Sequence, residues 1–170
     1  MRRAIGANAI VRHAVETAYG EKPAGERRRT PFVSATLGSA QGLIEDDTIA
    51  GRDGLDPAQD VIDVDGDLVM LVDQRSFGLW RNGPLGSPVM TGVAPILSHA
   101  FASGADVLPS AAIEIGPPDL AGGAFFDNLG CVVNSIALVF ARSGNNNATV
   151  NPICRKEELA PERHWPSTRR

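Results

Sequence analysis

The chain has 170 residues, enough for one ordinary domain and too few for two. Hydrophobic residues make up 43% and charged residues 21%, which excludes wholesale disorder, and no apolar run is long enough to span a membrane as a helix. The net charge of -4 is unevenly spread, because residues 45–67 contain nine acids and one base, whereas residues 1–30 contain seven bases and three acids.

The first third of the chain predicts short extended segments joined by turns. Residues 9–19 alternate imperfectly between apolar and polar types and also fit a helix, and we favour a strand. Residues 30–34 form a short extended segment after three consecutive arginines. Residues 38–66 show no sustained periodicity and many Asp and Gly residues, so we expect an acidic loop that is mobile in the isolated chain. Loops of this length are uncommon in compact domains and usually indicate binding, assembly or disorder.

The middle of the chain predicts a strand followed by a short helix. Residues 67–73 are predicted to form a strand that is entered from a turn at Asp65 and Gly66. Residues 76–81 are expected to form one or two helical turns. The Asn-Gly-Pro sequence at 82–84 should then end any helix, because proline lacks a backbone donor and clashes with the preceding turn.

The second half predicts strands at 97–102, 110–115 and 131–141, and a return strand at 148–153. Short strands with Gly and Pro between them indicate a mainly antiparallel β fold. The predicted core includes one face of the strand at 131–141, which is either Val132, Ile136, Leu138 and Phe140 or the residues that alternate with them. It also includes Leu68, Met70, Val72, Ile113 and Ile115. Residues 152–170 carry mixed charges and two further prolines after Pro152, so we expect a β domain at 1–151 followed by a basic, irregular tail.

The sequence proposes no catalytic or cofactor-binding residue. Cys131 and Cys154 cannot by themselves form a disulfide framework or a zinc site, and we expect free thiols in a reducing compartment. His13, His99 and His164 are isolated, without metal-ligand spacing, and no phosphate-binding glycine loop occurs. An enzyme is therefore not predicted.

The acidic segment superficially resembles a calcium-binding loop from Asp63 to Asp67. Counted from Asp63, however, the sixth residue is Leu68 instead of Gly and the twelfth is Gln74 instead of Glu, so an EF-hand is excluded. A looser site of oxygen ligands remains an alternative, and no metal ligand is predicted.

The order of several short segments resembles the tail tube proteins of tailed bacteriophages and prophages. The segments that carry the resemblance are residues 3–8, 16–24, 31–34, 42–44, 66–73, 77–80, 85–88, 99–101 and 108–114. The resemblance implies a β-sandwich or barrel-like core of two packed antiparallel sheets with a short helix. It also implies a structural, non-enzymatic subunit that forms rings, typically of six copies, stacked into a hollow conduit for DNA.

The resemblance further implies a location and partners. The expected location is the virion tail, with assembly in the bacterial cytoplasm, and the expected partners are further copies of the chain, other tail proteins and DNA in transient, non-specific passage. Two departures stand out: residues 81–84 replace a long apolar helix of the family, and the resemblance ends near Asn151. The second departure predicts a C-terminally truncated copy with incomplete sheets. A non-functional prophage remnant is therefore one alternative to a tube subunit, and a small metal-binding β domain is another.

The charged segments supply the candidate residues for assembly or for the lumen of a tube. In one hypothesis the acids face the channel and repel the phosphate backbone of DNA. In the other they meet arginines of a neighbouring subunit. The candidates are Arg27, Arg28, Arg29, Asp60, Asp63, Asp65 and Asp67.

Overall fold

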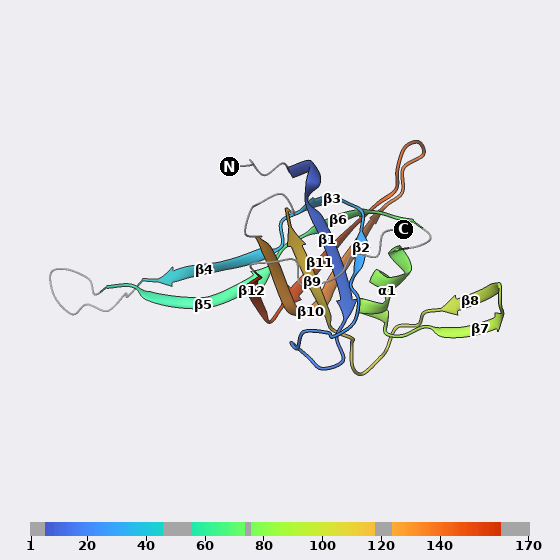
Figure 1. The fold of residues 1–170 in the computed structure, drawn as a ribbon, viewed down its shortest axis with the longest axis horizontal. Coiled ribbons are helices and arrows are strands. Elements are labelled where there is room, and N and C mark those ends of the chain that lie inside the picture. The colour runs from blue at the N-terminus through green and yellow to red at the C-terminus, as the bar shows by residue number, and fades with distance from the viewer. Residues whose placement is uncertain (1–5, 46–55, 74–75, 118–123, 161–170) are drawn as a thin grey trace.

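The computed structural model of the chain describes residues 6–45, 56–73, 76–117 and 124–160, and these are mostly β-strands (Figure 1). They also contain a short 3-10 turn, Gly6–Asn8, and the helix α1, Phe77–Leu85. The strands are β1 Ile10–Val15, β2 Arg28–Thr30, β3 Phe32–Ala35, β4 Gly38–Ile44, β5 Ala58–Asp65, β6 Leu68–Leu71, β7 Val89–Val93, β8 Ile96–Ala100, β9 Ala111–Gly116, β10 Phe125–Val139, β11 Asn147–Cys154 and β12 Lys156–Ala160.

The strand pairings of the described residues are antiparallel and form two connected layers. The order β2-β1-β9-β10-β11-β5-β4 runs through the main sheet, with β12 beside β10, and with β6 between β11 and β3. The 15-residue strand β10 belongs to both layers: its first half pairs with β9 and β12, and its second half pairs with β11. Its register shifts near Gly130, whose φ of 66° needs glycine. The expected fold class, mainly antiparallel β with a short helix, is confirmed.

The hydrophobic core lies between these layers and is covered by α1. Phe77 and Trp80 of the helix pack onto buried residues of β1, β6, β9, β10 and β11. Of the predicted core, Leu68, Met70 and Ile113 are buried, whereas Val72, Ile115 and Ile136 are partly buried and pack against the buried cluster.

The prediction is wrong at the end of β10. Leu138 is 44% exposed and Phe140, just past the strand, is 70% exposed. Their alternating neighbour Val139 is exposed as well. Here β10 no longer pairs with β9 or β12 and, among the described strands, pairs with β11 alone, so this end of the strand lies at an edge of the sheet and its side chains are exposed, whereas Ala148, opposite Leu138 on β11, remains in the core.

The expectation of an acidic loop at residues 38–66 is also wrong for the residues that the structure describes. They form the antiparallel hairpin β4–β5, in which Ser39 pairs with Val64 and Ile44 pairs with Ala58. Residues 46–55, between the two strands in sequence, lie outside the described residues. A strand with one buried face shows apolar residues at every second position, but both faces of this hairpin are mostly exposed, so the period is absent.

The helix α1 continues through the Asn-Gly-Pro sequence that was expected to end it. Pro84 lies in the last turn, and the helix ends at Gly86, whose N–H donates to Asn82 O at 2.9 Å. At Gly83 a Cβ atom would lie 2.5 Å from Val133 Cγ2. The glycine therefore lets the helix approach β10 closely, and this tertiary contact outweighs the low helix propensity of the segment.

The segment after Pro152 is not an irregular tail as far as Ala160. β11 extends to Cys154, and β12 adds a strand beside β10, with Leu129 paired to Lys156 and Phe125 to Ala160. Residues 161–170 lie outside the described residues. The cysteines are also not free: Cys131 and Cys154 form a disulfide, because the antiparallel register of β10 and β11 places the two residues opposite each other.

Candidate assembly surfaces

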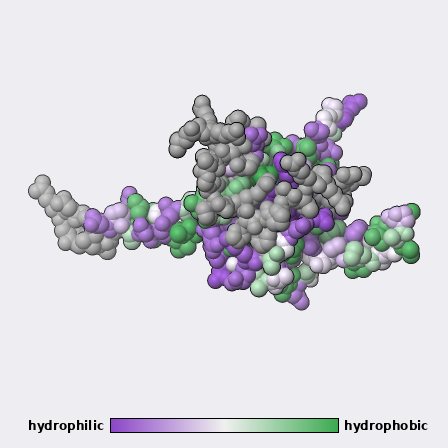
Figure 2. Space-filling model, in the orientation of Figure 1, coloured by the Kyte–Doolittle hydropathy of each residue, from purple (hydrophilic) through white to green (hydrophobic). Residues whose placement is uncertain are grey.

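The hairpin β4–β5 projects from one end of the molecule and carries exposed apolar and acidic side chains (Figure 1). Its exposed apolar residues are Leu43, Ile44, Val61 and Ile62, all in the half away from the core. A space-filling view shows this arm as a mixture of hydrophobic and hydrophilic surface (Figure 2). Exposed apolar side chains on both faces of a protruding hairpin are typical of a surface that is buried by a partner.

The four predicted acids lie along this hairpin and at its base, and all are exposed. Asp60, Asp63 and Asp65 lie on β5, and Asp67 lies in the turn before β6. Asp67 Oδ1 accepts a hydrogen bond from Asn151 Nδ2 at 2.9 Å, and Asp60 Oδ1 accepts one from the N–H of Val61 at 2.7 Å. None of the four forms an ion pair with a described residue, so their charges are available to solvent or to a partner.

The three arginines do not act as one group. Arg28 and Arg29 are exposed on β2, which is the last strand on its side of the main sheet. Arg27 is fully buried and forms a two-point ion pair with Asp127 of β10. Arg27 is therefore not available to a neighbouring subunit, and that candidate is wrong. A run of three identical residues gave no sign that one of them points inward.

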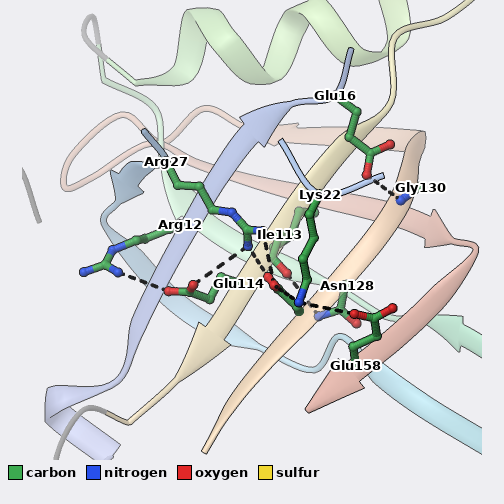
Figure 3. A network of polar contacts seen from close by, with 10 residues as sticks. Arg12, Glu16, Lys22, Arg27, Ile113, Glu114, Asn128, Gly130 and Glu158 are labelled. Atoms are coloured by element: carbon green, nitrogen blue, oxygen red, sulfur yellow. Dashed lines mark hydrogen bonds and ion pairs between the residues drawn. The ribbon is translucent and has the colours of Figure 1, made fainter. Parts of the chain in front are cut away.

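The buried pair belongs to a charged network across β1, β9, β10 and β12 (Figure 3). Arg12 Nη1 lies 3.1 Å from Glu114 Oε1, and Arg27 Nη1 lies 3.9 Å from Glu114 Oε2. Lys22 lies over this group, with Nζ 3.3 Å from Asp127 Oδ2 and 3.2 Å from a Glu158 carboxylate oxygen. The network therefore fastens the loop before β2 to the sheet.

The pKa values of the outer members follow from these contacts. Burial works against the charged form of Lys22, but hydrogen bonds to Glu158 and Asp127 outweigh it and raise the pKa of Lys22. The pKa of Glu158 is lowered, chiefly by its hydrogen bond to Lys156 and further by Lys22. The sequence offered one signal for this network: each of two largely apolar strands contains a charged residue, Arg12 in β1 and Glu114 in β9.

A buried carboxylate performs a similar fastening role at the other end of β1. Glu16 accepts hydrogen bonds from the N–H of Gly20 at 2.9 Å, the N–H of Gly130 at 2.8 Å and the hydroxyl of Ser110 at 2.6 Å. These donors come from the loop after β1, from β10 and from the segment before β9. The contacts hold the sheet together and offer no free reactive group.

His13 is also buried, between β2 and the helix α1. Its Nδ1 lies 2.8 Å from Thr30 Oγ1, and its ring lies against Trp80 with centroids 4.6 Å apart. Burial, and then the positive charge of Arg28, lower the pKa of His13 from 6.5 to about 4. It is a neutral core residue on β1 near pH 7.

A second projecting hairpin, β7–β8, was only half predicted: the sequence indicated β8, and β7 was missed. All residues of both strands are exposed, among them Val89, Met90, Val93, Ile96 and Leu97. The hairpin contains no Asp, Glu, Lys or Arg. It forms its own two-stranded sheet and lies at the end of the molecule opposite to β4–β5 (Figures 1 and 2).

The structure gives no sign of a metal centre or a membrane segment in the part it describes. Among residues 6–45, 56–73, 76–117 and 124–160, no three His, Cys, Asp or Glu side chains gather as a metal site. None of the helical segments described is long and apolar enough to cross a membrane.

Two protruding hairpins with exposed apolar side chains on a small antiparallel β core are typical of surfaces that partners bury, and comparison with known families points to a protein of an assembly. The model of the phage tail tube protein family matches residues 6–163. The chain belongs to the phage tail tube protein family. The resemblance read from the sequence is thereby confirmed, but it does not end near Asn151, because the match continues through β12. The protein is a structural component of a virion tail, a subunit of its tube.

Solved structures with the same fold come from related assemblies. One is a chain of the anti-feeding prophage baseplate, with 9% identity, a TM-score of 0.62, and coverage of 94% of this chain and 97% of that one. Another is the SPP1 tail tube, with 8% identity, a TM-score of 0.58, and coverage of 94% and 80%. A third belongs to the sheath–tube complex of the extracellular contractile injection system PVC, with 12% identity, a TM-score of 0.57, and coverage of 94% and 92%.

At such identities these likenesses establish the fold alone. Among curated protein sequences none matches the chain.

Proposed function

We propose that this tail tube subunit associates laterally into rings, typically of six copies, and that the rings stack into a conduit for DNA. The observation that carries the proposal is the pair of hairpins, β4–β5 and β7–β8. Their apolar side chains are exposed although the subunit has a buried hydrophobic core of its own. Burial of apolar surface between subunits is the main driving force of such association. The subunit itself carries no catalytic site in this proposal, and it assembles in the bacterial cytoplasm before it joins other tail proteins.

In this proposal the exposed acidic residues determine how the wall of the channel interacts with DNA. Asp60, Asp63, Asp65 and Asp67 are exposed and face no cation of the described chain, so a ring of subunits repeats this negative charge around its axis. Negative charge repels the phosphate backbone, whereas a basic wall would bind DNA tightly by releasing counterions. DNA therefore passes without adhering to the wall.

The first experiment tests assembly. Purified wild-type protein at rising concentration is followed by light scattering and negative-stain electron microscopy, with and without calcium. We expect rings or tubes in both conditions. A protein that stays monomeric at every concentration would overturn the tube proposal, and assembly only with calcium would favour the metal-binding alternative.

The second experiment tests the acidic wall. The four acids are replaced by Asn, and Asp106→Asn, an exposed acid outside the hairpin, is the matched control. We expect unchanged melting of the monomer, and tubes that retain more short double-stranded DNA at low salt than wild-type or control tubes. Equal DNA retention would refute the role in the channel. Assembly that instead becomes weak and insensitive to salt would place the acids against Arg28 and Arg29 of a neighbour.

A further inference from the structure

The two projecting hairpins lie at opposite ends of the longest axis of the molecule (Figure 1). Each hairpin also ends its sheet. β4 is the last strand of the main sheet, and β7 and β8 pair only with each other among the described residues. Each therefore presents a free backbone edge together with exposed apolar side chains. The unpaired backbone groups of such an edge hydrogen-bond to strands of other chains unless a partner covers the edge or charged side chains oppose the pairing.

The chemistry of the two ends is complementary. The outer half of β4–β5 carries the exposed apolar residues Leu43, Ile44 and Val61 beside the acid Asp60, and the described residues beyond it, Glu45 and Asp56, are acidic and exposed. The hairpin β7–β8 has no charge of its own that would have to be desolvated. At its foot, the guanidinium of Arg81 lies 4.5 Å from the ring centroid of Phe101, directly after β8. Arg28 and Arg29 add exposed positive charge on β2, which is at the opposite end of the main sheet's strand order from β4.

We propose that the β4–β5 hairpin of one subunit packs on the β7–β8 hairpin of the next subunit, as a head-to-tail contact within the ring. The inference rests on the proposed function and assigns its lateral contact to two named surfaces. A contact between two different ends of one chain is heterologous, so each subunit uses one end for each neighbour and the series closes into a ring when the rotation permits. The apolar residues supply burial, and Glu45 and Asp56 approach the neighbour's arginine-bearing side.

A mixing experiment with two disabled variants tests this contact. Val93→Asp with Ile96→Asp removes the β7–β8 surface, and Val61→Asp with Ile62→Asp removes the β4–β5 surface. The four residues are 84%, 81%, 73% and 57% exposed, so the substitutions leave the core intact. Val107→Asp, at an exposed position in the loop before β9, is the matched control.

We expect each variant alone to remain monomeric at concentrations where the wild type and the control assemble. An equimolar mixture should form a 1:1 dimer and stop there, because one variant retains an intact β4–β5 end and the other an intact β7–β8 end. Sedimentation velocity, with one variant carrying a mass tag, reads the stoichiometry. Thermal unfolding checks that each variant folds, and Ser replaces Asp in any variant that does not.

Other outcomes overturn the contact. Self-association of either variant alone would show that the removed end is not required, or that an end pairs with its own kind. A monomeric mixture beside an assembling wild type would show that the two ends meet other surfaces, and would leave the tube proposal standing. A wild type that does not assemble would overturn the proposed function itself.

Discussion

Arg27 and Asp127 form an ion pair that solvent does not reach, although 100 positions separate them in the chain. In the second hydrogen bond of the pair, Arg27 Nη2 donates to Asp127 Oδ2 at 3.2 Å. The pair joins the segment before β2 to β10. It explains why one arginine of a run of three serves the fold, while the other two remain on the surface.

Removal of the arginine should therefore destabilise the subunit strongly. Arg27→Met leaves the Asp127 carboxylate buried with Lys22 as its remaining ion-pair partner among the described residues, and we expect a loss of about 3 kcal/mol in the free energy of unfolding. Arg29→Met, two positions further along on β2 and exposed, should change it by less than about 0.5 kcal/mol. Urea unfolding of dilute monomer measures both, and equal effects would contradict the assignment of Arg27 to the interior.

His13 predicts a dependence of stability on pH. Its pKa is about 4 in the folded state and 6.5 in the unfolded chain, so the unfolded chain binds the extra proton between these values. The free energy of unfolding should therefore fall as pH is lowered through this window, by about 2 kcal/mol between pH 7 and pH 5 from this group alone.

Comparison of two histidine variants isolates this effect. His13→Asn keeps a polar group near Thr30 but does not titrate, so its stability should fall less than that of the wild type over the same pH range. His99→Asn changes an exposed histidine on β8 and should preserve the wild-type dependence. Parallel pH profiles for wild type and His13→Asn would show that His13 binds its proton over the same pH range in the folded and the unfolded chain, and would contradict the lowered pKa.

The disulfide between Cys131 and Cys154 should stabilise the subunit by restricting the unfolded chain. The cysteines are 23 positions apart, for which loop closure predicts about 3 kcal/mol. The double variant Cys131→Ala, Cys154→Ala should lose this amount in chemical unfolding. Thiol reductant should lower the wild-type midpoint toward that of the variant and leave the variant unchanged. A wild-type midpoint indifferent to reductant would indicate that the protein as purified holds free thiols.

Two leucines provide a matched test of the core. Leu68 of β6 is fully buried, and Leu68→Ala should cost about 3 kcal/mol through lost burial and a residual cavity. Leu138 of β10 is 44% exposed, and Leu138→Ala should cost less than about 1 kcal/mol in the monomer. Calorimetry of the two variants under monomeric conditions checks the order, and a larger effect at Leu138 would contradict the position of the core.

Local sequence patterns predicted the elements whose side chains have a regular environment. β9 and β11 were recognised because apolar and β-branched residues fill a half-buried strand. The second half of β10 was recognised from the same residue types, although most of its side chains are exposed. The order of short segments along the chain also indicated the tail tube family. These features depend on neighbours a few residues apart, which a single sequence records directly.

The remaining features depend on partners that are distant in the chain. The helix α1 passes through Pro84 because Gly83 packs against Val133, fifty positions later. Arg27 is buried because Asp127 lies opposite it, and Cys131 meets Cys154 because two strands share a register. The hairpin β4–β5 showed no pattern because neither of its faces is consistently buried. The sequence by itself thus determined the β class, several strands and the family, whereas the choice of buried charges, the disulfide and the projecting ends were decided by tertiary packing, since only packing brings those residues together.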